Sequence, residues 1–266
     1  MTQTRIILPS KTFREDNIKA LYVGINYQDE ADKQQWLPMV KISWNKGYYY
    51  YSFTKGFAAH YDELKGNVLN PQRGYTQTWK DQEVPWWLNQ RIPHRADSME
   101  IYDIFGLGNH KGDFIALFAR TGGRRNGDYY DLFAELAPQD NRYEYYFPIF
   151  GLPGLVKAGK KAVAALADNI KRGQELELVL TPERCEIYCL GIYIGHTPPY
   201  LHYLLSHNPQ CQYRAWTEIV NSDEYRYAYK IVGKIEVYST SSIYSFESLQ
   251  PINLMPIHNE SNISSL

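Results

Sequence analysis

Three arginines flank a pair of glycines at one point of the chain. This segment reads Arg120, Thr121, Gly122, Gly123, Arg124 and Arg125. Consecutive glycines allow backbone N–H groups to converge on an anion, and arginines add fork-shaped donors that match phosphate or carboxylate. The segment is not a Walker A loop, because no Gly-Lys-Ser/Thr follows it. The alternative is a glycine turn whose arginines face solvent or pair with Asp128, Asp131 and Glu135.

A second candidate site is the aromatic run Tyr145, Tyr146 and Phe147. Stacking of a nucleic-acid base on an aromatic side chain contributes about 1–3 kcal/mol. Successive side chains of a strand point to opposite faces, so at most two of the three rings can reach a ligand. We predict Tyr145 and Tyr146 as candidate nucleic-acid-binding residues.

Two tryptophans, Trp86 and Trp87, follow Pro85 at the expected start of a short helix. On a helix they cannot both face the core, so one of them is a candidate anchor for a protein partner. Packing at a seam between domains is the alternative. We assign Trp86, Trp87 and Arg91 to this candidate protein-binding surface.

Recognised catalytic and metal motifs are missing from the sequence. None of the seven histidines pairs with a Ser or Cys nucleophile motif, and HExxH, GxSxG, GxGxxG and kinase signatures do not occur. The three cysteines, Cys185, Cys189 and Cys211, form no CxxC pair, and further metal ligands near them are not evident. We therefore expect no catalytic residues, no metal and no cofactor.

Composition and charge narrow the class of protein. The 24 tyrosines and the aromatic fraction of 15% favour strands. The formal net charge of −1 gives no basic footprint for nucleic acid, although a local patch is compatible with it. No apolar run approaches the roughly 20 residues of a membrane span, and the start of the sequence lacks a signal-peptide pattern. These features predict a cytoplasmic protein that does not bind membranes.

The elements that must position these residues are mainly strands. The pattern predicts strands at 21–27, 36–44 and 48–54, with a hairpin turn at 45–47. Turn residues at 137–141 predict a boundary between two parts. Beyond this boundary we expect a strand at 143–150, a helix at 162–170, and a strand in which Leu176, Leu178 and Leu180 share one face.

The second part contains four segments with a recognisable pattern: FPIFGL at 147–152, the helix at 162–170, GQELEL at 173–178 and IGHTP at 194–198. Together they resemble a HIRAN domain. It implies a small OB-like barrel, and some members of the family bind the 3′ end of single-stranded DNA. Residues 181–187 are shorter than the corresponding family stretch and lack its Asn and Asp, so the resemblance supports the fold more than it supports DNA binding.

The first part is similar to two bacterial groups. The segments at 119–125 and 87–95 resemble stand-alone HIRAN-containing proteins, whereas 49–53 and 86–93 resemble the N-terminal subdomain of HipA-type kinases. The kinase core itself is not in the sequence. In some toxin–antitoxin systems this subdomain is a separate protein that restrains the kinase, so the resemblance implies an antitoxin-type partner.

The sequence thus predicts a β-rich α+β protein in two parts. We expect an N-terminal extension (1–20), a HipA-N-terminal-like α+β module (21–137), a HIRAN-like OB/SH3-like β-barrel (141–240) and a flexible tail (241–266). The predicted function is a non-catalytic regulatory protein that binds a HipA-like kinase or a related bacterial partner. The alternative is a HIRAN-type module that binds single-stranded DNA ends.

Overall fold

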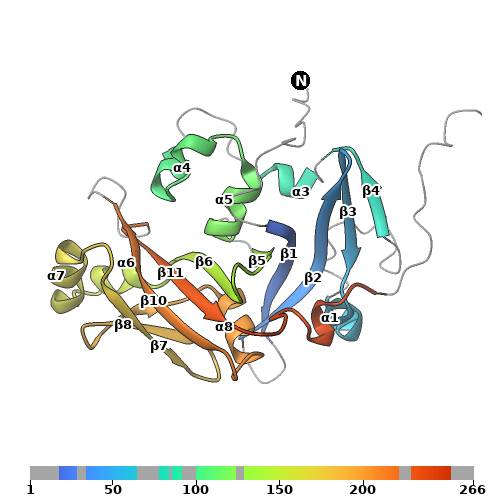
Figure 1. Cartoon of the computed structure of the whole chain (residues 1–266). Coiled ribbons are helices and arrows are strands. Elements are labelled where there is room, and N and C mark those ends of the chain that lie inside the picture. The colour runs from blue at the N-terminus through green and yellow to red at the C-terminus, as the bar shows by residue number, and fades with distance from the viewer. Residues whose placement is uncertain are drawn as a thin grey trace, which may run out of the picture.

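The structure is a computed structural model that describes residues 18–28, 34–64, 78–83, 86–91, 100–123, 129–221 and 229–252. It is a strand-rich α+β fold with two antiparallel sheets (Figure 1), and this confirms the predicted class. Six of the described helices are α1 (Lys55–Ala59), α2 (Tyr61–Leu64), α3 (Trp86–Asn89), α4 (Glu100–Ile104), α6 (Leu152–Lys157) and α7 (Lys161–Asn169), with 3-10 turns at η3 (Gly108–His110) and η5 (Glu247–Leu249).

The first sheet has five strands. In spatial order they are β4 (Thr78–Asp81), β3 (Tyr48–Phe53), β2 (Gln34–Asn45), β1 (Ile18–Gln28) and β5 (Tyr130–Leu136). The turn between β2 and β3 contains Lys46 at φ 48° and Gly47 at φ 83°, as expected of a two-residue hairpin. This agrees with the turn predicted at 45–47, and β1 begins three residues before its predicted start.

The second sheet has six strands. In spatial order they are β6 (Arg142–Pro148), β11 (Ile231–Tyr238), β10 (Gln212–Val220), β7 (Glu175–Leu180), β8 (Cys185–Cys189) and β9 (Ile192–His196). The chain passes from the first sheet to the second at 137–141, where Asp140 and Asn141 adopt positive φ angles.

An isolated bridge joins the two ends of the second sheet. Phe150, just after β6, and His196, in the last strand β9, exchange backbone hydrogen bonds of 2.9 and 2.8 Å. A Cβ atom on Gly195 would lie 2.2 Å from the carbonyl oxygen of Phe150, and Gly195 has a φ of 142°. Only glycine allows the two backbones to approach this closely.

One hydrophobic core contains residues from both sheets. Val23 and Phe133 of the first sheet belong to the same buried cluster as Phe147 and Ile235 of the second. The helix α8 (Pro199–Ser206) contacts strands of both sheets, and its Tyr200 stacks on Phe133 with ring centroids 5.9 Å apart. The sheets are therefore packed together rather than joined only by the chain.

Residues 239–252 form a segment that we call the C-terminal strap. The hydroxyl of Tyr244 accepts a hydrogen bond from the backbone N–H of Leu136 in β5 (2.8 Å) and is hydrogen-bonded to the hydroxyl of Tyr145 in β6. Farther along, the backbone N–H of Ile252 donates to the carbonyl of Phe53 in β3 (3.0 Å). The strap thus contacts both sheets.

The packing of the strap differs from the flexible tail predicted at 241–266. Ile243 and Leu249 are fully buried, and Tyr244 is 5% exposed. Serines flank these apolar residues, so the composition of the segment resembles a disordered tail although its apolar side chains pack in the core. Residues 253–266 lie outside the described part of the chain.

Candidate binding face

The predicted anion loop is the C-terminal end of helix α5 (Phe114–Thr121). The backbone N–H of Gly122 donates to the carbonyl of Phe118 (2.9 Å), and the N–H of Gly123 donates to the hydroxyl of Thr121 (3.0 Å). Both donors are therefore used within the helix end, which also carries the negative end of the helix dipole. The predicted convergence of glycine N–H groups on an anion is wrong.

The two glycines instead allow the helix end to pack against β5. Gly122 and Gly123 have φ angles of 73° and 57°, which end the helix in the left-handed region that glycine favours. A Cβ atom on Gly123 would lie 2.5 Å from Leu132 Cδ1. The two glycines therefore form a glycine turn, which was the alternative interpretation of the sequence. Arg124 and Arg125 lie outside the described residues.

Arg120 points away from the glycines, towards the second sheet. Its guanidinium carbon lies 4.0 Å from the ring centroid of Tyr146, and its Nη1 donates to the carbonyl of Phe105 (2.7 Å). A guanidinium this close to an aromatic ring forms a cation–π contact. Arg120 and Tyr146, which the alternative of DNA-end binding assigns to one nucleic-acid-binding set, are thus in contact in the structure.

Tyr145 does not reach the same surface. Its side chain is 2% exposed and is hydrogen-bonded to Tyr244 in the core, because it alternates with Tyr146 along β6. Burial raises the pKa of Tyr145 well above its usual value. The predicted role of Tyr145 in base stacking is therefore wrong, whereas the side chain of Tyr146 is half-buried.

The predicted tryptophan surface is also only partly described. Trp87 is 8% exposed and belongs to the hydrophobic core, so it is not an exposed anchor, and the side chain of Trp86 lies outside the described residues. The guanidinium of Arg91 lies 5.8 Å from the ring centroid of Tyr130. Within the described residues, Trp87 of the predicted protein-binding surface is therefore a core residue, and Arg91 lies over the ring of Tyr130.

The outer side of β6, β11 and β10 carries a row of aromatic and cationic side chains that sequence reasoning missed. Tyr146 pairs with Lys234, and Lys234 pairs with Trp216, across the three strands. The Nζ atom of Lys234 lies 5.4 Å from the ring centroids of both Tyr146 and Trp216. The guanidinium of Arg214 lies 5.3 Å from the Trp216 ring, so each ring lies between two cations.

A second row on the same strands is made of ion pairs. Glu236 is paired with Arg214 (2.6 Å) and Arg142 (3.2 Å), and Glu144 is paired with Arg142 (3.0 Å) and Lys234 (2.8 Å). Three cations therefore share two carboxylates. Charge-assisted hydrogen bonds of this kind fix the side chains in place.

The carboxylate of Glu236 and the ammonium of Lys234 remain charged in this row. Burial opposes ionisation of Glu236, but hydrogen bonds from Arg214 and Tyr238 and the nearby arginines outweigh it and lower its pKa. Burial likewise disfavours the charge of Lys234, but its hydrogen bond to Glu144 and the surrounding negative charge raise its pKa.

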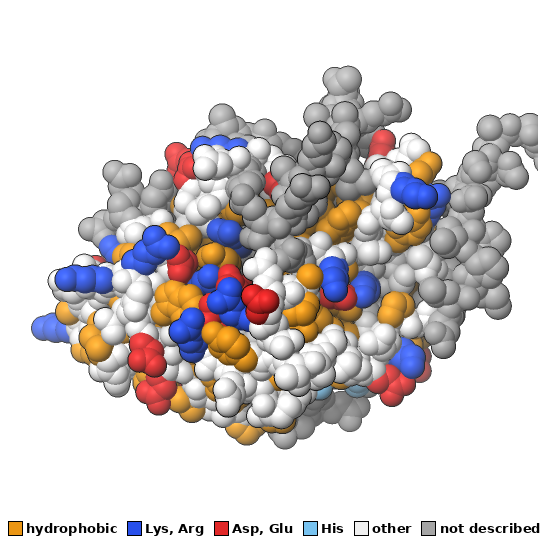
Figure 2. Space-filling view, viewed as in Figure 1, with side chains coloured by type: hydrophobic (Ala, Val, Ile, Leu, Met, Phe, Trp, Pro, Cys, Tyr) orange, Lys and Arg blue, Asp and Glu red, His pale blue; other side chains and the backbone are white. Residues whose placement is uncertain are grey.

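We call the outer side of these three strands the open face; one of its side chains, Glu236, is only 3% exposed. It consists of the outward side chains Arg142, Glu144, Tyr146, Arg214, Trp216, Glu218, Lys234, Glu236 and Tyr238. At one end, Ile104 and Phe105 cover it by packing on Val232. Figure 2 shows apolar, basic and acidic side chains gathered over β10 and β11 with no other element in front of them.

Cysteines and metal-ligand clusters add no second site. Cys185 and Cys189 are buried in the core, and burial raises the pKa of Cys185 to about 12, so it is a thiol and a poor nucleophile. Within the described ranges, no group of three His, Cys, Asp or Glu side chains could hold a metal ion. None of the described helices has the length and apolar character needed to cross a membrane.

The open face is therefore the most distinctive surface among the described residues: two aromatic rings held between cations, above a row of shared ion pairs. Comparison of the chain with protein families, curated proteins and solved structures found no match.

Proposed function

We propose that this chain is a non-catalytic regulatory protein that binds a protein partner through the open face. The observation that carries the proposal is the row in which Tyr146, Lys234 and Trp216 lie side by side at the surface. Aromatic residues and arginine are enriched in protein interfaces, where a few of them contribute most of the binding energy. Trp216 and Tyr146 are the anchors of this surface.

Charge balance favours protein over nucleic acid as the partner. Glu144 and Glu236 already neutralise most of the charge of Arg142, Arg214 and Lys234. Binding to phosphates depends on cations that exchange salt counterions for phosphate. On the resemblance of 21–137 to the HipA N-terminal subdomain, we propose a HipA-type kinase as the partner and an antitoxin-type role for the chain.

A second candidate function is binding of single-stranded DNA ends by 141–240. Half-buried rings next to cations are the arrangement on which bases stack, and the open face offers Tyr146 and Trp216 in this way. The bridge between Phe150 and His196 supports a sheet that closes into the HIRAN-like barrel, which is the scaffold that this candidate requires.

The test compares binding by the full chain and by two matched variants. We expect Trp216→Ala to weaken binding to the purified HipA-type kinase of the source organism by about 10- to 100-fold, as loss of an interface anchor does. The control is Tyr213→Ala, because Tyr213 lies on β10 and is 36% exposed but points to the opposite side of the strand. Isothermal titration calorimetry measures both.

A labelled oligonucleotide with a free 3′ end is titrated in parallel at low and at moderate salt. Equal kinase binding by the Trp216→Ala variant and the unchanged chain contradicts the proposal. Oligonucleotide binding that falls steeply with salt and is lost in Trp216→Ala, without kinase binding, supports the second candidate instead.

A further inference from the structure

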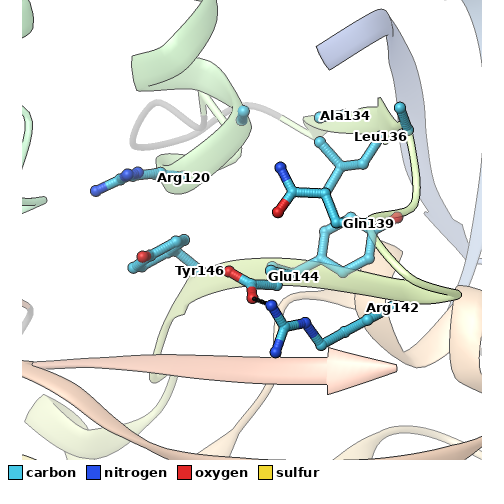
Figure 3. A pocket seen from close by; sticks show the side chains of 10 residues that line it. Arg120, Ala134, Leu136, Gln139, Arg142, Glu144 and Tyr146 are labelled. Carbon is cyan, nitrogen blue, oxygen red and sulfur yellow. Dashed lines mark ion pairs between the residues drawn. The ribbon is translucent and has the colours of Figure 1, made fainter. Parts of the chain in front are cut away.

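A pocket of about 260 Å³ lies where the two sheets meet. Its walls come from the end of α5, the end of β5, the turn at 137–141 and the outer side of β6 (Figure 3). The lining side chains are those of Ala119, Arg120, Ala134, Leu136, Ala137, Gln139, Arg142, Glu144, Tyr145 and Tyr146. We call it the seam pocket, and both halves of the chain are needed to build it.

Part of the lining of the seam pocket, which we call the floor, is apolar. It is formed by Ala119, Ala134, Ala137 and Leu136. Three of these four residues are alanines, and their short side chains leave the space that larger residues would fill. An apolar floor of this kind binds the hydrocarbon part of a ligand.

Most of the other lining side chains, which we call the rim, are polar, and Gln139 is one of them. In Figure 3 the side chains of Arg120 and Tyr146 lie to the left of the Gln139 amide, and those of Glu144 and Arg142 lie below it. The backbone N–H and C=O groups of Gln139 pair with Arg142 at 2.9 and 3.0 Å, which fixes the turn. Its side-chain amide has no hydrogen-bond partner among the described residues.

The charges around the rim favour an anion. Arg142 uses its terminal nitrogens on Glu144 and Glu236, and its Nε is buried with no hydrogen-bond partner in the described part of the chain. The lining of the pocket itself holds two guanidinium groups, those of Arg120 and Arg142, and one carboxylate, that of Glu144, so its net charge is positive.

The arginines are also held in position before any ligand arrives. Arg120 is fixed by the carbonyl of Phe105 and by the ring of Tyr146, and Arg142 is fixed by two carboxylates. A side chain that is already ordered loses little conformational entropy on binding. Preorganised guanidinium groups are suited to carboxylate and phosphate.

From these observations we infer that the seam pocket binds a small organic anion. Its carboxylate or phosphate lies at the rim, between Arg120, Arg142 and the amide of Gln139, and its apolar part lies on the alanine floor. The volume is slightly below the roughly 300–1,000 Å³ of pockets for drug-sized ligands, so the ligand is smaller than those. This site goes beyond the proposed partner binding, because its ligand is a small molecule.

Thermal unfolding and calorimetry of the full chain test the inference with defined probes. Sodium benzoate supplies a carboxylate on an apolar body, and sodium phosphate supplies a phosphate without one. Benzamide is the neutral match of benzoate, and sodium chloride controls for ionic strength. We expect benzoate, phosphate or both to raise the Tm saturably, whereas benzamide and chloride leave it unchanged; the responding anion identifies the headgroup.

Three variants distinguish the pocket from a general ionic effect. Gln139→Ala removes the rim amide, and Ala137→Leu fills the floor; we expect each to weaken probe binding at least 10-fold while the unliganded protein remains folded by circular dichroism. Arg184→Gln is the matched control, because Arg184 pairs with Glu186 and lies over Tyr193 on another strand, and it should bind normally.

Three results would overturn the inference. The first is the lack of a saturable response to either anion, and the second is an equal response to benzamide. The third is unchanged affinity in a folded Ala137→Leu variant. Since kinase binding by the open face is measured separately with Trp216→Ala, failure of one proposal is distinguishable from failure of the other.

Discussion

Gly195 occupies a position where two backbone segments approach too closely for any side chain. Its φ of 142° lies in a region that is essentially restricted to glycine. The neighbouring strand turn contains another glycine, Gly191, with a φ of 72° and nothing within 4 Å of the position of a Cβ atom. Replacing each glycine in turn therefore separates the energetic cost of the positive φ angle from the cost of a steric clash.

We expect Gly195→Ala to destabilise the protein by about 3 kcal/mol or more, because it adds a steric clash with Phe150 to the backbone penalty. Gly191→Ala should cost only about 1–2 kcal/mol, since it carries the backbone penalty alone. Urea unfolding of both variants measures the difference. If both variants lose the same free energy of unfolding, the close approach of Gly195 to the backbone of Phe150 does not contribute to stability.

The ion-pair row shows how three strands act as one unit. Glu236 on β11 holds Arg142 on β6 and Arg214 on β10, so a single carboxylate connects strands that are far apart in the sequence. Because the folded protein lowers the pKa of Glu236, this carboxylate stabilises the fold above its unfolded pKa. The stabilisation is lost as the pH falls through the folded pKa.

We expect Glu236→Gln to lower the free energy of unfolding at pH 7 by about 1–3 kcal/mol, since it leaves two arginines without their shared carboxylate. The difference between the variant and the unchanged chain should begin to shrink below the unfolded pKa of about 4.3 and should disappear only below the lower folded pKa, where the carboxyl group is protonated in both states. Chemical denaturation at a series of pH values below 7 checks this. A difference that is independent of pH would show that Glu236 acts through packing rather than charge.

The sequence predicted the features that neighbouring residues in the chain determine, and it failed for features that depend on contacts between distant residues. Strand alternation predicts that Tyr145 and Tyr146 face opposite sides, but which side is buried depends on the partner Tyr244, about a hundred residues away. The row of Tyr146, Lys234 and Trp216 could not be predicted either, because strand pairing and register are not visible in local periodicity. The β-rich class and the hairpin at 45–47 were predictable from composition and turn residues.

The glycine pair gives a second reason for a wrong prediction. A helix end and an anion-binding loop both use glycines at positive φ, so Gly122 and Gly123 fit either one. The difference lies in the acceptors of their N–H groups, which are Phe118 and Thr121 in the structure. Sequence alone does not specify those acceptors.

At the scale of the whole molecule, the C-terminal strap connects the two sheets. We expect truncation after residue 240 to prevent stable folding. Loss of Ile243, Tyr244 and Leu249 removes about 1.5–3 kcal/mol for each buried side chain, and the total stability of a typical protein is only about 5–15 kcal/mol.

The control is truncation after residue 252, which keeps every strap contact described above and should change the free energy of unfolding by less than about 1 kcal/mol. Circular dichroism and urea unfolding distinguish the two forms. A cooperative transition of normal stability in the shorter chain would show that the sheets hold together without the strap.

The position of the strap at the end of the described chain also affects when the first sheet can complete its packing during translation. The strap emerges from the ribosome after every strand of both sheets, yet Pro251 bridges to Thr54 beside the third strand of the chain. Contacts between such distant residues slow folding, because a long loop must close before they form. The first sheet must therefore wait, incompletely covered, until the end of the second has been synthesised, and this interval is when the nascent chain most needs protection from aggregation.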